Sequence, residues 1–112
     1  MRIAVVGSRK FPDLARVRQM VMELPKDTVI ISGGAYGVDQ AAEKAARSAG
    51  LTSHVITPDY PTFGRVAPLH RNRKIVEMAD HVVAFWDGLS GGTANAIAWA
   101  ATLGKPVTVH RP

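Results

Sequence analysis

Short apolar runs alternate with longer amphipathic segments along the whole chain. Five of the runs are rich in β-branched or apolar residues and predict buried strands; they cover residues 2–6, 28–31, 52–57, 81–85 and 106–109. Four longer segments carry apolar or small residues at helical spacing and predict helices; they cover residues 12–24, 38–49, 68–78 and 94–103. Residues 58–67 are predicted to form a polar loop, which is long for a small domain.

This alternation predicts an α/β fold, in which a parallel, doubly wound, Rossmann-like sheet has helices on both faces. The predicted order of its five strands is 3-2-1-4-5. Ligands of such sheets bind outside the carboxyl ends of the strands, where the strand order reverses. The sequence therefore places a ligand site beside the ends of the first and fourth strands.

Three turns rich in glycine and serine follow the central strands of this predicted sheet. They comprise residues 7–9, 32–39 and 87–93. A single turn of this kind is explained by the backbone geometry that glycine permits. Three of them on neighbouring strands would lie side by side on one rim, and we interpret them as the walls of one pocket.

None of these turns has the G-x-G-x-x-G spacing of a dinucleotide-binding loop or the G-x-x-x-x-G-K-[ST] spacing of a P-loop. The sequence thus argues against an ordinary NAD-dependent dehydrogenase and against a P-loop ATPase. Gly91, Gly92 and Thr93 nevertheless stand at the N-terminus of the last predicted helix, where backbone N–H groups and the helix dipole favour a phosphate. The Thr93 hydroxyl either joins that phosphate site or caps the helix, and both interpretations remain open.

Several side chains near the turns have a candidate ligand contact and an ordinary structural alternative. Arg9 can clamp a phosphate or carboxylate, or it can be a surface arginine. Asp39 can accept hydrogen bonds from a ribose, or it can favour the positive end of its helix. Tyr36 can stack on a base or serve in packing. Arg71 and Asn72 can close over a ligand, or they can form a solvated helix end.

The chain has 112 residues, the size of one domain with its own core, and its net charge is +5. This charge suits nucleotides, phosphates or nucleic acid, or it reflects a solvated basic surface without a partner. Arg65, Arg71, Arg73 and Lys74 concentrate part of it within residues 65–74. Cysteine, a signal peptide and a membrane-spanning run are all absent, so we expect a cytoplasmic protein without membrane association.

The residue patterns required by several kinds of enzyme are missing. The four histidines lack metal-ligand spacing, and no close pair of carboxylates suggests glycosidase chemistry. Ser8, Ser32 and Ser90 have no evident histidine and acid partners for nucleophilic catalysis. The sequence predicts neither a metal site nor a cofactor. Trp99 is either part of the core or, if exposed, the mark of a homo-oligomer interface.

Four motifs occur in a fixed order along the chain: Gly7-Ser8-Arg9, the segment 32–39, Arg71-Asn72-Arg73 and the segment 87–93. Together they resemble the motifs of the SLOG superfamily, the Rossmann-like domains shared by Smf/DprA proteins and LOG enzymes. The resemblance covers nearly the whole chain and is strongest to the small stand-alone YspA-like branch of bacteria and phages. It implies that a nucleotide or nucleotide-derived ligand binds at the predicted rim.

LOG enzymes carry P-G-G-x-G-T-x-x-E, in which the glutamate is catalytic. Ala96 stands at the position of that glutamate in this chain, and no proline precedes the glycines. Loss of a general acid or base typically costs a factor of about 100 or more. The resemblance therefore favours a binding protein over an N-glycosidic hydrolase.

The leading hypothesis is a sensor or sequestering module for a nucleotide, or for a small molecule derived from ADP-ribose or NAD. The alternatives are a LOG-like hydrolase of nucleoside monophosphates and a DprA-like binder of single-stranded nucleic acid that uses residues 65–74. The predicted ligand-binding residues are Gly7, Ser8, Arg9, Ser32, Gly33, Gly34, Tyr36, Asp39, Arg71, Asn72, Asp87, Ser90, Gly91, Gly92 and Thr93.

Overall fold

A computed structural model describes all 112 residues and contains one parallel sheet of five strands. The strands are β1 (Arg2–Gly7), β2 (Val29–Ser32), β3 (Thr52–Val55), β4 (His81–Phe85) and β5 (Val107–His110). Their order, β3-β2-β1-β4-β5, confirms the predicted doubly wound, Rossmann-like fold. β1 pairs with both β2 and β4, so the strand order reverses beside it.

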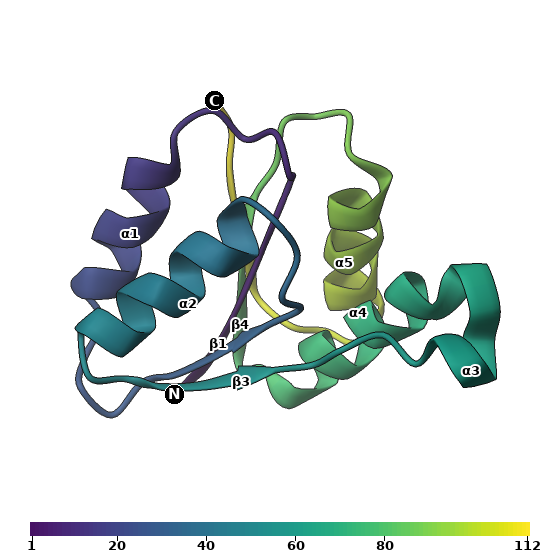
Figure 1. The fold of residues 1–112 in the computed structure, drawn as a ribbon, viewed down its shortest axis with the longest axis horizontal. Helices are drawn as coiled ribbons and strands as arrows, with labels where there is room; N and C mark the ends of the chain where they lie inside the picture. The colour runs from purple at the N-terminus through teal and green to yellow at the C-terminus, as the bar shows by residue number, and fades with distance from the viewer.

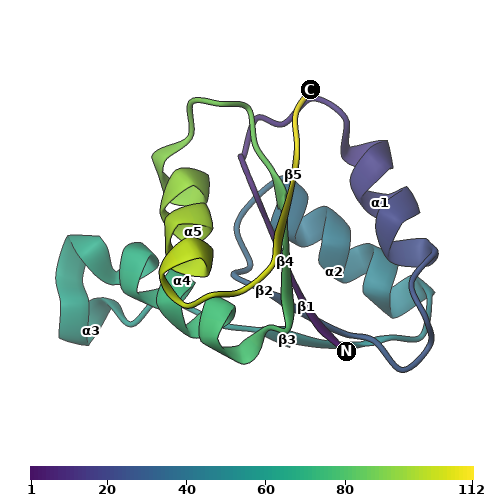
Figure 2. The same ribbon diagram turned by 180° about the vertical axis from the view of Figure 1, so that it is seen from behind.

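Helices cover both faces of the sheet. They are α1 (Leu14–Met22), α2 (Val38–Ser48), α3 (Tyr60–Phe63), α4 (Ala67–Met78) and α5 (Gly91–Thr102), with a 3-10 turn, η1 (Gly64–Val66), between α3 and α4. Figures 1 and 2 show α1 and α2 on one face and α4 and α5 on the other. None of these helices is long and apolar enough to cross a membrane.

The sheet separates two hydrophobic cores, because alternate residues of a strand point to opposite faces. In β1, Ile3 and Val5 belong to the core that includes α1 and α2, whereas Ala4 and Val6 belong to the core that includes α4 and α5. Trp99, which the sequence left between core and interface, is half-buried and packs against this second core.

Residues 58–67 are not the irregular loop that the sequence predicts, because α3 and η1 lie within them. Asp59 begins α3 by accepting a hydrogen bond from the Thr62 N–H at 3.2 Å. A helix of four residues is too short for an apolar period to be visible in the sequence. α3 and η1 have no buried residue and project beside α4 (Figures 1 and 2), and we call them the α3 arm.

Gly37 is expected to be far less replaceable than Gly50, although their φ angles, 82° and 73°, both lie in a region that L-amino acids rarely adopt. A Cβ atom at Gly37 would lie 2.7 Å from the Arg9 carbonyl oxygen, whereas one at Gly50 would meet nothing within 4 Å. Gly50→Ala is therefore expected to lower the free energy of unfolding by about 1–2 kcal/mol, and Gly37→Ala by about 1–3 kcal/mol more. Urea denaturation measures both losses; equal losses would contradict the close contact at Gly37.

Candidate functional site

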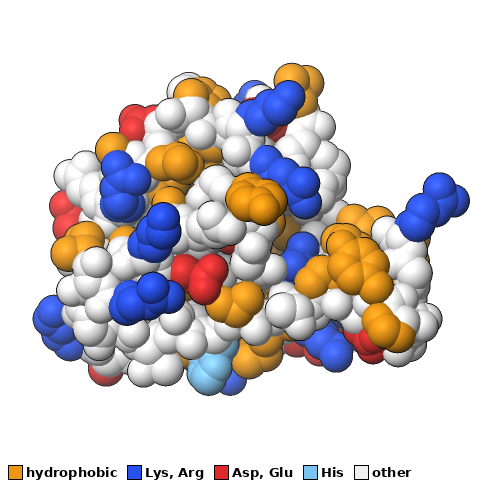
Figure 3. Space-filling view, in the orientation of Figure 1, with side chains coloured by type: hydrophobic (Ala, Val, Ile, Leu, Met, Phe, Trp, Pro, Cys, Tyr) orange, Lys and Arg blue, Asp and Glu red, His pale blue; other side chains and the backbone are white.

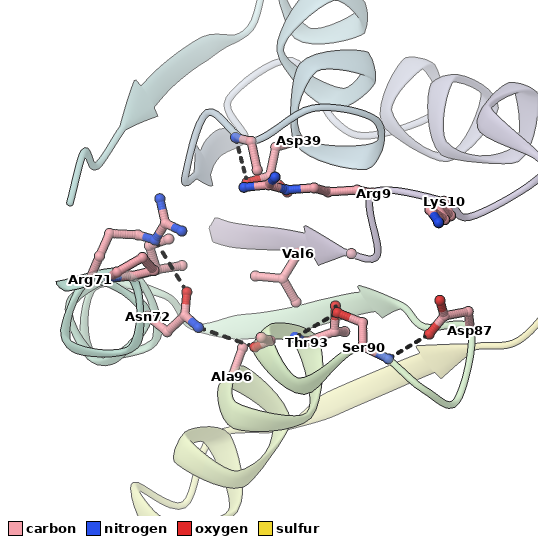
Figure 4. A pocket seen from close by; sticks show the side chains of 15 residues that line it. Val6, Arg9, Lys10, Asp39, Arg71, Asn72, Asp87, Ser90, Thr93 and Ala96 are labelled. Carbon is pink, nitrogen blue, oxygen red and sulfur yellow. Dashed lines mark hydrogen bonds between the residues drawn. The ribbon is translucent and has the colours of Figure 1, made fainter. Parts of the chain in front are cut away.

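A cavity of about 400 Å³ lies at the carboxyl end of the sheet. Figure 4 shows the turns after β1 and β2 on one side of it, and α5 with its preceding turn on the other. α4 closes one end. This is the rim at which the sequence predicts three turns to meet, and we call it the rim cavity.

Ser8 fastens the first turn to the third. Its side chain is buried, and its Oγ accepts a hydrogen bond from the Asp87 N–H at 3.2 Å. The same Oγ lies 3.5 Å from Thr93 Oγ1 and shares a hydrogen bond with it. Ser8 therefore does not line the cavity but holds the residues that do, whereas Thr93 lies in the cavity wall.

Asp87 shapes the third turn. Its Oδ1 accepts hydrogen bonds from the N–H groups of Leu89 and Ser90, each at 2.8 Å. The hydrogen bonds from Ser90 and Leu89 lower the pKa of the Asp87 carboxyl, so it is ionised at neutral pH. Ser90 is the N-cap of α5, and its Oγ accepts a hydrogen bond from the Thr93 N–H at 3.5 Å. The interpretation of Thr93 as the cap is therefore wrong.

α5 begins at Gly91 rather than at residue 94, so Gly91 and Gly92 are its first two residues. The first N–H groups of a helix have no partner within it, and the Ser90 side chain satisfies that of Thr93. A Cβ atom at either glycine would meet nothing within 4 Å. An anion can therefore approach these two N–H groups and the positive end of the helix dipole.

Asp39 braces the second turn from within. The residue is only 5% exposed, and its Oδ2 accepts hydrogen bonds from the N–H groups of Gly33 at 3.0 Å and Ala35 at 3.3 Å. Burial raises the pKa of Asp39 from 3.8 to about 6, and these hydrogen bonds and nearby Arg71 oppose the rise. Asp39 thus holds the second turn closed. The sequence predicted either a contact with a ribose or an interaction with the helix dipole, and neither includes this role.

Arg71 and Asn72 connect α4 to both walls of the cavity. Arg71 Nη1 donates to the Gly33 carbonyl oxygen at 2.7 Å, and its Nε donates to Asn72 Oδ1 at 3.2 Å. Asn72 Nδ2 donates to the Gly92 carbonyl oxygen at 3.1 Å and to Asn95 Oδ1 at 3.2 Å. The pair is therefore not a solvated helix end, because its hydrogen bonds hold the two sides of the cavity at α4.

Arg9 and Lys10 add positive charge to the rim cavity. Both are exposed residues that line it, and neither side chain takes part in the ion pairs of the protein, Arg2–Asp80 and Arg73–Glu77. Figure 4 shows the Arg9 side chain extending towards the part of the wall that holds Asp39.

The cavity thus brings together cationic groups, a helix N-terminus and two carboxylates. The cations are Arg9, Lys10 and Arg71, and the carboxylates are those of Asp39 and Asp87. Backbone N–H groups already occupy an oxygen of each carboxylate. The guanidinium, ammonium and N–H donors therefore suit a phosphate. No group of three or more His, Cys, Asp and Glu residues is arranged to hold a metal ion.

The structure brings nine of the predicted ligand-binding residues into the cavity wall: Gly7, Arg9, Asp39, Arg71, Asn72, Asp87, Ser90, Gly92 and Thr93. The other six do not line it: Ser8, Ser32, Gly33, Gly34, Tyr36 and Gly91. Ser32 is fully buried at the end of β2, and its hydroxyl has no hydrogen-bond partner. Gly34 and Tyr36 are exposed on the second turn.

Six further residues line the cavity: Val6, Lys10, Ala35, Pro68, Ile75 and Ala96. Lys10 is predictable from the sequence as a candidate, because it is basic and adjoins Arg9. The other five are apolar, and only the tertiary structure shows that they face a cavity. Ala96 presents a methyl group where LOG enzymes, by the resemblance, have their catalytic glutamate.

Comparisons with known proteins agree with this fold. The sequence model of the DNA recombination-mediator protein A family matches residues 1–63. A candidate DNA processing protein DprA of Mycobacterium tuberculosis is 34% identical over 111 residues, which cover 73% of this chain and 28% of that protein. The gene 61 protein of Mycobacterium phage D29 is 30% identical over 116 residues, covering 95% of this chain and 93% of the phage protein.

Two solved structures of DNA processing protein A share the fold at 23% sequence identity. The Streptococcus pneumoniae structure has a TM-score of 0.82 and is matched over 96% of this chain and 49% of its own. The Helicobacter pylori structure, which concerns a single-stranded DNA binding mode, has a TM-score of 0.75 over 97% and 64%. The chain therefore spans about a quarter of the mycobacterial relative and about half of the streptococcal protein.

The family match over residues 1–63 and the phage relative over 95% of the chain confirm the resemblance that the sequence motifs indicate. The observed strand order is the one predicted from the alternation of strands and helices. The chain belongs to the DNA recombination-mediator protein A family, within the Smf/DprA-like Rossmann domains of the SLOG superfamily.

Proposed function

We propose that this chain binds single-stranded DNA by holding one phosphorylated nucleotide of the strand in the rim cavity. Membership of the DNA recombination-mediator protein A family supports a DNA ligand. The Helicobacter pylori protein with the same fold supports a single strand in particular. These relatives extend beyond the matched region, so the proposal concerns this domain and its cavity alone.

The observation that carries the proposal is the convergence of phosphate donors on one cavity. Arg9, Lys10 and Arg71 reach it from two different segments of the chain, and Gly92 brings the N-terminus of α5. A phosphate seated at α5 accepts hydrogen bonds from backbone N–H groups and from the guanidinium groups. The Thr93 hydroxyl donates to Ser90 Oγ at 3.3 Å and so supports the start of the helix. This donor set recognises the phosphate and does not depend on the identity of the base.

The surroundings of the cavity suit the nucleoside. Pro68, which is half-buried, gives its α4 wall an apolar surface for a sugar or base. Tyr36 beside the cavity is 70% exposed, and Tyr60 on the α3 arm is 55% exposed. Figure 3 shows Lys and Arg side chains and exposed hydrophobic groups on the same face of the molecule. Stacking of successive bases on exposed aromatic side chains is a common feature of single-strand binding.

A free nucleotide, or a small molecule derived from ADP-ribose or NAD, is the second candidate ligand. The size of the cavity, about 400 Å³, favours it, because pockets for small molecules begin at about 300 Å³. The phosphate donors serve both ligands equally well. The two candidates differ in how the affinity depends on the length of the strand.

Fluorescence anisotropy with oligothymidylates of one to fifteen nucleotides separates these candidates. We expect the affinity to rise with length, and its logarithm to fall with the logarithm of salt concentration at a slope of about −0.7 for each phosphate contacted. Thymidine monophosphate and ADP-ribose are expected to compete weakly. Equal competition by a mononucleotide and a long strand would favour the small-molecule candidate instead.

The hydrolase alternative receives less support from the cavity wall. Ala96 is 1% exposed and offers no acid or base, and the backbone already engages both cavity carboxylates. We expect no release of base when nucleoside monophosphates are incubated with the protein and followed by mass spectrometry. Base release that Thr93→Val abolishes would reinstate this alternative.

A further inference from the structure

A second cavity, of about 280 Å³, lies between the α3 arm and α4. Its lining includes Phe63 from the arm and His70, Arg71 and Lys74 from α4. Nothing in the proposed function uses it. Its size is smaller than that of the rim cavity, and its walls combine aromatic rings with cationic groups.

α4 separates the two cavities as a ridge. Of the α4 residues that line only one cavity, those at positions 68, 72 and 75 line the rim cavity, and those at positions 67, 70, 73, 74 and 77 line the second cavity. These two series are neighbouring stripes of one helix, because each follows the helical spacing of three or four residues. Arg71 lies between the stripes and lines both cavities.

The Arg71 guanidinium can serve a ligand that passes from one cavity to the other. It has five N–H donors, of which the protein uses one on the Gly33 carbonyl oxygen and one on Asn72 Oδ1. Three donors remain for the oxygens of a phosphate. A phosphate on the ridge would therefore be held by Arg71 while its two nucleosides point into different cavities.

An aromatic pair forms part of the wall of the second cavity. The rings of Phe63 and His70 are stacked, with their centroids 4.0 Å apart and their planes 14° apart. His70 is exposed, and Phe63 is half-buried. A planar aromatic surface of this kind favours the stacking of a nucleic-acid base, whichever base it is.

Most charged side chains of the second cavity already have a partner within the protein. The cavity therefore suits a base better than a second phosphate. Arg73 forms an ion pair with Glu77 at 2.7 Å, and Asp59 caps α3. Lys74 takes part in no ion pair. The unpaired cations are thus Lys74 and, at the boundary with the rim cavity, Arg71.

We infer that the second cavity receives the base of the next nucleotide of the same single strand, with the intervening phosphate on Arg71. This inference rests on the proposed function, since it assumes that the first nucleotide occupies the rim cavity. It adds a defined subsite for a second nucleotide and gives Phe63 of the α3 arm a role in binding. It also predicts that a single strand binds more tightly than a duplex, because the base must be unpaired to stack.

The test compares phosphorylated dithymidylate with thymidine monophosphate by isothermal titration. The wild-type protein is expected to bind the dinucleotide at least about fivefold more tightly, which is the lower range of one base stacked on an aromatic side chain. His70→Ala and Phe63→Leu are expected to bring this ratio close to one without changing the affinity for the mononucleotide. Leu69→Ala is the matched control, because Leu69 is an exposed residue of α4 that lines neither cavity.

A second readout places 2-aminopurine at either position of the dinucleotide. Its fluorescence is expected to be quenched at the stacked position in the wild type and recovered in His70→Ala, with circular dichroism confirming that the variants are folded. A wild-type ratio near one, an unchanged ratio in both variants, or the absence of quenching would overturn the inference while the rim cavity remains a nucleotide site. Failure to bind either ligand or longer strands would overturn the proposed function as well.

Discussion

Raising the pH from about 4 to about 7 is expected to lower the stability of the wild-type protein by up to about 3 kcal/mol relative to Asp39→Asn. The reason is the raised pKa of Asp39, which burial shifts from 3.8 to about 6. Between these two values the folded protein binds the proton more tightly than the unfolded chain. Stability is therefore highest while Asp39 is protonated, and it falls as the pH rises through the folded pKa.

Asp39→Asn is the appropriate reference because its amide oxygen can still accept the hydrogen bonds from Gly33 and Ala35. Urea denaturation of both proteins at several pH values measures the difference. The lowered pKa of His110 has the opposite effect on stability near neutral pH, and because it is common to both proteins it cancels. A difference that does not change with pH would show that folding does not raise the pKa of Asp39.

Arg71→Ala is expected to weaken the binding of single-stranded DNA about tenfold to a hundredfold. Hydrogen bonds to a charged group contribute about 1.5–3 kcal/mol, and Arg71 offers its remaining donors at the junction of the two cavities. Arg71→Lys keeps the charge but loses the planar fork, so it should recover only part of the affinity. Fluorescence anisotropy with an oligothymidylate measures all of these variants.

The matched control for Arg71 is Arg47→Ala, which removes the same charge from the last turn of α2. Arg47 is exposed and lines neither cavity, so its loss should change the affinity by no more than about twofold. Equal losses for the two variants would mean that net charge alone drives binding. That result would contradict the rim cavity as the DNA site.

Most of the fold could be predicted from the sequence, because the relevant signals are local. The apolar run of β1 and the small-residue face of α2 identify a buried strand and the helix that packs on it. The order 3-2-1-4-5 is a common one among doubly wound sheets, and the structure has it. The α3 arm escaped prediction because its four-residue helix depends on a cap at Asp59 rather than on a hydrophobic period.

The candidate site was less predictable than the fold. Glycine turns and basic residues identified Arg9, Gly92 and Thr93, which line the cavity. The same criterion also selected Ser32, whose side chain lies in the protein interior. A serine that follows a strand produces the same sequence pattern whether its side chain faces a ligand or the core. The sequence gives no means of separating these two cases.

The sequence by itself determined that a parallel sheet brings three turns rich in glycine and serine and a helix N-terminus to one rim. Only the tertiary structure decided how that rim is closed. Ser8 bonds to the N–H of Asp87, 79 positions away, and Arg71 bonds to the carbonyl of Gly33, 38 positions away. Such hydrogen bonds depend on where packing places each side chain, and no local pattern of residues encodes that placement. The Arg71 hydrogen bond connects α4 to the second turn, and Arg71 lines both cavities, which is the basis of the second nucleotide subsite proposed above.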